Sequence, residues 1–167
     1  EADATTPREG MLTQDDERAL LARVAAGDRG AFQRFYTGYH RRLGRFLRRI
    51  VARHELVEEI VNDTMFVVWQ KAADFRGDSR VSTWVFGIAY RRALKTLKHV
   101  RDAAPPGATV QEGELERLPA GEDAVDQREQ RQWIDRGLAA LPLDQRVAIE
   151  LAYFMGNSCE EIAAIVD

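Results

Sequence analysis

Apolar residues recur every three or four positions along most of the chain. This is the spacing of a helix that buries one face. The clearest stripe runs from Phe32 to Val51, and shorter ones follow it. No segment shows the alternation of apolar and polar residues that is typical of a strand. The pattern therefore predicts an all-α fold.

Start and stop residues divide the first hundred residues into four helices. Thr13 is a candidate N-cap with Asp16 at the capping-box position, and Gly27 ends that helix. Asp28 is a candidate cap for the next helix. A polar loop, residues 74–80, precedes the fourth. The predicted helices span about residues 13–26, 28–53, 55–73 and 82–100.

Helical patterning returns near the end of the chain. One predicted helix begins at about residue 126 and is broken by Pro142. Asp144 is expected to cap a short helix that Gly156 ends. Ser158 and Glu161 then form a capping box for the last helix.

We therefore expect two small helical domains. Residues 1–10 are a loose tail, residues 11–101 form the first domain and residues 126–167 form the second. Residues 102–125 contain three prolines, and six acidic residues against one arginine. That composition is typical of an extended, flexible linker.

The two parts of the chain carry opposite charge. Residues 1–101 hold 19 Lys and Arg against 13 Asp and Glu, whereas residues 102–167 hold 5 against 14. Genome composition is one explanation for the dominance of Arg over Lys, but it does not explain this segregation. The basic part is therefore expected to contact a polyanion.

Several classes of protein are disfavoured. The single cysteine, Cys159, forms no intramolecular disulfide, and the three histidines are too scattered for a zinc site. His54-Glu55 lacks the second histidine of a zinc-protease helix. No segment has the ~20 apolar residues of a membrane helix, and no secretory signal is evident. We predict a cytoplasmic protein without cofactor or metal, not inserted in a membrane and not an enzyme.

Three stretches resemble one family, in the family's order along the chain. Residues 58–69, EEIVNDTMFVVW, resemble the core-polymerase-binding helix of bacterial RNA polymerase sigma factors of the extracytoplasmic-function (ECF) group. Residues 75–94, beginning FRGDS, are similar to the segment of those proteins that melts promoters. Residues 141–163, with LP, QR and GNSCEEIA, resemble the start of their second DNA-binding domain.

The chain also departs from the family pattern. Asn62 and Asp63 stand where Gln and Glu are commoner, and Val67 where a basic or polar residue is common. The sequence ends after the helix that should precede the recognition helix, so the second domain is expected to be a truncated helix-turn-helix. As given, it should not read the upstream promoter element.

The resemblance implies that one face of residues 58–69 binds a coiled coil in the largest subunit of core RNA polymerase. A polar arc alone usually marks the solvated side of a helix. Apolar side chains expected to be exposed beside it favour a partner. The candidate core-polymerase-binding residues are Glu58, Glu59, Asn62, Asp63, Phe66 and Val67.

The loop at 75–79 is either a plain connector or, as the resemblance implies, the pocket that holds an unpaired base of the −10 element. Basic residues on the following helix can neutralise phosphates. Tyr90 is the expected stacking residue, and Trp84 is expected in the core. The candidate DNA-binding residues are Phe75, Arg76, Gly77, Asp78, Ser79, Tyr90, Arg91, Lys95 and Lys98.

The sequence thus predicts an alternative sigma factor that binds core RNA polymerase and opens promoter DNA by capturing the single-stranded −10 non-template strand. The acidic linker would then run through polymerase channels that nucleic acid otherwise occupies. The resemblance also implies an anti-sigma factor as partner, and a monomer is expected for the free chain. The alternative is a helical protein-interaction module with a basic, nucleic-acid-binding face.

Overall fold

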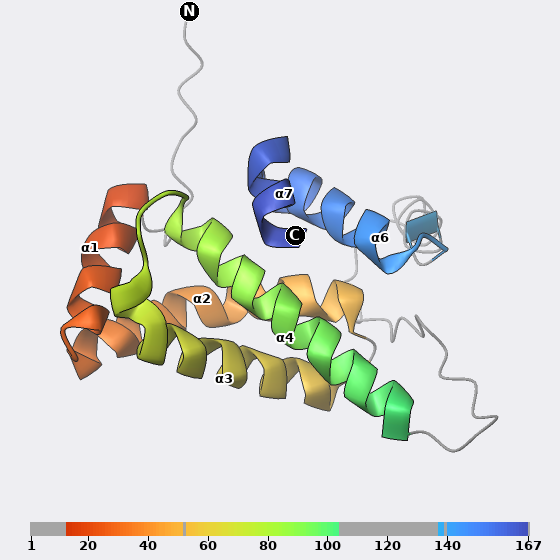
Figure 1. Ribbon diagram of the computed structural model, residues 1–167, viewed down its shortest axis with the longest axis horizontal. Helices are drawn as coiled ribbons and strands as arrows, with labels where there is room; N and C mark the ends of the chain where they lie inside the picture. Colours follow the sequence, from red (N-terminus) through yellow and green to blue (C-terminus); the bar gives the residue numbers. More distant parts are fainter. Residues whose placement is uncertain (1–12, 52, 104–136, 139, 167) are drawn as a thin grey trace, which may run out of the picture.

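The computed structural model describes residues 13–51, 53–103, 137, 138 and 140–166. Every regular element among them is helical, as predicted (Figure 1). The predicted tail, nearly all of the linker and most of the helix before Pro142 lie outside the described residues. The elements are α1 (Gln14–Ala25), α2 (Arg29–Ile50), α3 (His54–Lys71), the 3-10 turn η1 (Ala72–Asp74), α4 (Val81–Ala103), α6 (Leu143–Ile149), the π-helical turn η2 (Glu150–Phe154) and α7 (Cys159–Val166).

The predicted caps of the first two helices are confirmed. The Thr13 hydroxyl accepts from the Asp16 N–H at 3.2 Å, and the Asp16 carboxylate accepts from the Thr13 N–H. Asp28 accepts from the N–H of Ala31 at 3.0 Å. These hydrogen bonds favour the charged carboxylates, so the pKa of each is lowered.

Two predicted helix limits are wrong. The second helix ends at Ile50 rather than near Arg53, because Arg53 is already the N-cap residue of α3. Pro142, not Asp144, is the N-cap residue of α6. The proline lacks an N–H but its carbonyl accepts from the N–H of Arg146, which fits the start of a helix.

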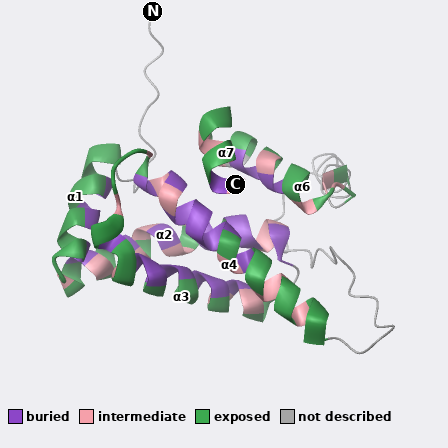
Figure 2. Cartoon of the chain, viewed as in Figure 1, coloured by how far each residue is buried: buried purple, intermediate pink, exposed green. Residues whose placement is uncertain are grey.

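Helices α1 to α4 pack around a common core, with α4 lying between α3 on one side and α7 on the other (Figure 1). Phe46 of α2 meets Phe86 of α4 edge to face, with ring centroids 5.3 Å apart. Such a contact contributes about 0.5–1.5 kcal/mol beyond its area. The first half of α4 is buried almost all round (Figure 2).

A buried ion pair joins α1 to α2. The Glu17 carboxylate accepts from Arg42 at 2.8 Å, and its side chain is 7% exposed. The Arg42 guanidinium also lies 4.8 Å from the ring centroid of Tyr39. Burial, with the nearby Glu17 charge, raises the pKa of Tyr39 far above its usual value. The sequence did not single out this pair, because its two members are far apart in the chain.

Helices α6 and α7 extend the same apolar core. Val147, Leu151 and Ile165 are fully buried and belong to one cluster with the residues of α1 to α4. Arg146 is also buried, and it donates to the carbonyls of Leu138 and Leu141 at 3.0 and 3.1 Å. The predicted capping box of α7 is confirmed.

No helix among these described segments is both long and apolar enough to cross a membrane.

Candidate functional site

The outward face of α3 carries most of the predicted polymerase-binding side chains. Glu59, Asn62 and Asp63 are exposed, Glu58 is half-buried, and Phe66 is 59% exposed. Phe66 is thus a large apolar side chain in solvent beside acidic groups, as expected.

The exposure expected for Val67 is wrong. Val67 is 8% exposed and belongs to the apolar core. It lies three residues after Thr64 and seven after Ile60, both of which are buried. Residues at these spacings share one helix face, so Val67 turns inward while Phe66 turns outward.

Side chains of α2 border this face of α3 and contact two of its residues. The Tyr36 hydroxyl donates to Asn62 Oδ1 at 2.9 Å. His40 Nε2 lies 3.0 Å from Glu58 Oε2. Tyr36 and His40 were not predicted as site residues, although their spacing of four on α2 places them on one face. The candidate surface therefore spans two helices.

The loop between η1 and α4 is fixed at one point by α1. Gly77 has a positive φ of 80°, a conformation that glycine adopts without strain. Its carbonyl accepts from Arg18 of α1 at 3.3 Å. On either side, Arg76 and Asp78 are exposed. This loop can therefore present polar groups to a ligand from a defined backbone.

Two aromatic rings flank the loop. Phe75 and Trp84 are both partly buried, with ring centroids 5.4 Å apart. Trp84 was expected in the core, and it packs at the edge of the core rather than inside it. Ser79 is half-buried, and its hydroxyl donates to the carbonyl of Arg80 at 3.3 Å.

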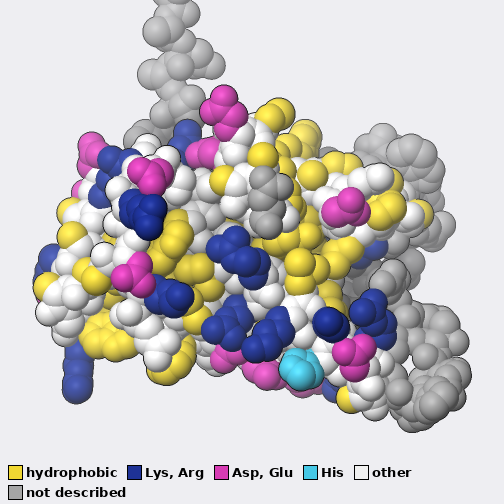
Figure 3. Space-filling model, viewed as in Figure 1, with side chains coloured by type: hydrophobic (Ala, Val, Ile, Leu, Met, Phe, Trp, Pro, Cys, Tyr) yellow, Lys and Arg dark blue, Asp and Glu magenta, His cyan; other side chains and the backbone are white. Residues whose placement is uncertain are grey.

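The basic residues of α4 are placed for contact with an anion. Arg91, Lys95 and Lys98 are all exposed, at spacings that put them on one side of the helix. Figure 3 shows Lys and Arg side chains gathered over the middle of this face of the molecule, where α4 runs in Figure 1.

Tyr90 is not available as an exposed stacking platform in this arrangement. It is 6% exposed. Burial raises the pKa of Tyr90, and the negative charge of Asp144 raises it further. The apolar stretch Val85–Tyr90, interrupted only by Gly87, was the available signal, since a helix that is apolar all round is buried on all sides.

Known proteins show the same combination of sequence and fold. The Sigma-70 region 2 family matches residues 35–103. The ECF RNA polymerase sigma-E factors of Salmonella typhimurium and Escherichia coli K12 are each 31% identical over 166 residues, covering 94% of this chain and 86% of theirs. The RNA polymerase sigma-H factor of Pseudomonas aeruginosa is 28% identical over 165 residues, covering 93% and 85%.

A solved structure agrees in fold. It shows CnrH in complex with the cytosolic domain of CnrY, with a TM-score of 0.63 and 21% identity over 90% of this chain and 82% of that one. The helical fold, the ordered motifs and the sequence matches define a sigma factor.

The chain belongs to the ECF group of RNA polymerase sigma factors. It is an alternative sigma factor that directs transcription initiation, and as such it binds core RNA polymerase and promoter DNA. The alternative of a non-sigma interaction module is therefore set aside.

Proposed function

We propose that the outward face of α3 is the surface that binds core RNA polymerase. The single observation that carries this proposal is Phe66, a large apolar side chain held in solvent beside Glu59 and Asp63. An isolated acidic arc needs no partner, but an exposed ring within it favours one. Val67, being buried, is left out of this surface.

The test is a titration of the full chain with core RNA polymerase. Asp63→Lys should weaken binding at least tenfold without loss of helicity, because it places a positive charge at the centre of an acidic face. Asp15→Lys is the matched control, since Asp15 is an exposed acid on α1. Equal affinities for Asp63→Lys and the wild type would overturn the assignment.

The loop at residues 75–79 is, in the same proposal, the pocket for an unpaired base of the −10 non-template strand. Support comes from its exposed Arg76 and Asp78 and from the partly buried rings of Phe75 and Trp84 next to it. A flipped base needs polar groups that hydrogen-bond to its edge and aromatic rings that stack on its face.

Exchanging residues 76–79 for an unrelated loop should change which base is preferred in a −10 oligonucleotide bound to the polymerase complex. An unchanged preference would place the pocket elsewhere. Replacing Arg91, Lys95 and Lys98 by glutamine should lower the salt dependence of binding for all sequences alike.

An anti-sigma protein is the proposed regulatory partner. The support is the solved complex of CnrH with the cytosolic domain of CnrY, whose sigma chain shares this fold. Co-expression of the full chain with the cytosolic domain of CnrY, followed by co-purification, tests whether the chain can bind a protein of this kind. Failure of that domain to bind the folded chain would count against the proposal.

A further inference from the structure

The loop that precedes α4 is anchored at both ends by its neighbours. The ring centroid of Phe75 lies 5.4 Å from that of Trp84, and the Phe75 N–H donates to the carbonyl of Ala72 in η1 at 3.4 Å. At the other end, the carbonyl of Arg80 accepts from the N–H of Trp84 in the first turn of α4. Residues 76–78 lie between these two anchors.

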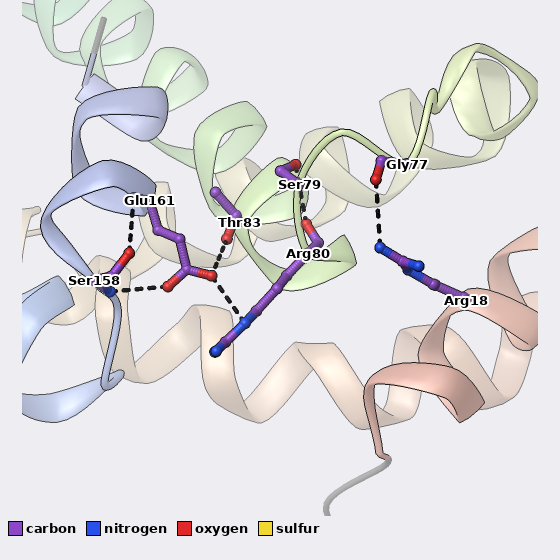
Figure 4. A network of polar contacts seen from close by, with 7 residues as sticks. All are labelled: Arg18, Gly77, Ser79, Arg80, Thr83, Ser158 and Glu161. Atoms are coloured by element: carbon purple, nitrogen blue, oxygen red, sulfur yellow. Dashed lines mark hydrogen bonds and ion pairs between the residues drawn. The ribbon is translucent and has the colours of Figure 1, made fainter.

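The middle of the loop is held from α1. Nη2 of Arg18 donates to the carbonyl oxygen of Gly77 at 3.3 Å (Figure 4). Within the described part of the chain, no other hydrogen bond or ion pair reaches residues 76–78. Helix α1 is itself fixed, because Glu17, the residue before Arg18, is buried in its ion pair with Arg42 of α2. Arg18 therefore ties the tip of the loop to a firmly docked helix.

This hydrogen bond sets the orientation of one peptide group. The C=O of Gly77 and the N–H of Asp78 belong to the same planar trans peptide, so they point in opposite directions. Since the carbonyl faces α1, the N–H of Asp78 faces away from α1, and no described group accepts a hydrogen bond from it. The cationic donor also polarises the peptide, which strengthens the N–H as a donor. The loop thus offers a backbone donor at an exposed residue.

Without Arg18, little else opposes rotation of this peptide group. Gly77 has a positive φ of 80°, and glycine tolerates backbone conformations of either sign. No heavy atom lies within 4 Å of the place where a Cβ of Gly77 would stand, so packing does not hold the backbone there. The rotated loop would present a carbonyl acceptor where the N–H donor now stands.

We infer that Arg18 is a positioning residue for base choice: by holding the Gly77 carbonyl, it keeps the N–H of Asp78 turned toward the bound base. An N–H pairs with an acceptor on the base edge, whereas a carbonyl pairs with an amino group or a ring N–H. The orientation of this peptide therefore selects between bases. The role in base choice rests on the proposed pocket at residues 75–79, but the hold of Arg18 on the loop does not.

Arg18→Gln removes the charge and shortens the side chain, so the Gly77 carbonyl loses its donor. Arg23→Gln is the matched control. Arg23 is an exposed arginine of the same helix, and it pairs with Asp28 at 2.6 Å rather than with the loop. Both variants lose one positive charge and one exposed contact of a guanidinium.

The hold on the loop is measured first, on the full chain without DNA. Backbone nitrogen relaxation by NMR gives order parameters for the amides of Gly77 and Asp78. They should be close to the ~0.85 of rigid backbone in the wild type and in Arg23→Gln, and below ~0.6 in Arg18→Gln. Low values already in the wild type, or equal values in all three proteins, would overturn the hold.

Base choice is measured second, on the complex of each full chain with core RNA polymerase. A set of single-stranded −10 oligonucleotides that differ at one base gives the ratio of affinities for the best and the worst base. That ratio should fall about three- to tenfold in Arg18→Gln, because a single exposed hydrogen bond contributes modestly, and should change less than about twofold in Arg23→Gln. The affinity for core polymerase itself should not change.

A direct contact of Arg18 with a phosphate is the competing explanation. It would weaken binding of every oligonucleotide alike and lower the salt slope by about one, and that result would overturn the positioning role. An unchanged ratio in Arg18→Gln, when exchange of residues 76–79 does alter base preference, would overturn it as well. If that exchange has no effect either, the proposed pocket is at fault and the role in base choice falls with it, while the order parameters still confirm or overturn the hold on the loop.

Discussion

Removal of Glu17 should destabilise the protein by about 2–3 kcal/mol. Loss of one partner from a buried ion pair costs ~3–5 kcal/mol, because the other charge is left without compensation. Glu17 is nearly inaccessible, but Arg42 keeps 29% of its side chain in solvent. The Tyr39 ring at 4.8 Å also continues to attract the guanidinium. Both effects lower the stability loss expected for Glu17→Ala below the range usual for a buried ion pair.

Urea denaturation of the full chain, followed by circular dichroism, measures this loss. Asp15→Ala is the control, since an exposed acid in the first turn of the same helix should change stability by no more than about 1 kcal/mol. Arg42→Met fills similar space without charge, so the double variant with Glu17→Ala should lose about 1.5–2 kcal/mol less than the sum of the single variants. Additive losses, or a loss for Glu17→Ala below 0.5 kcal/mol, would refute the ion-pair argument.

Three further predictions concern single contacts. The pKa of Asp28 is lowered in the folded chain, chiefly because its carboxylate accepts from the Ala31 N–H. The charged carboxylate therefore stabilises the fold above the unfolded pKa of about 3.9, and this stabilisation is lost as the pH falls through the lower folded pKa. The difference in unfolding free energy between the wild type and Asp28→Asn should therefore narrow from pH 6 to pH 3 in urea titrations. Tyr36→Phe removes the hydrogen bond to Asn62 and should lower the affinity for core polymerase about two- to tenfold, while thermal unfolding stays unchanged. Arg146→Lys keeps the charge but loses the forked donor geometry. It should lower the free energy of unfolding by about 1–2 kcal/mol, measured from the shift of the urea midpoint at an unchanged slope.

The local features of the fold could be predicted from the sequence. The caps at Thr13 and Asp28 and the capping box of Ser158 with Glu161 depend on residues three positions apart. Their physics is contained in a single helical turn, and so is visible in the sequence. The apolar spacing predicts helices for the same reason, because it too is a local pattern in the sequence.

Features that depend on tertiary packing could not be predicted in this way. Val67 and Phe66 are neighbours in sequence. Which of them is buried depends on which face of α3 packs against the core. Tyr90 is buried and lies close to Asp144 of α6, a helix that begins far along the chain. The Glu17–Arg42 pair likewise needs α1 and α2 to be docked first.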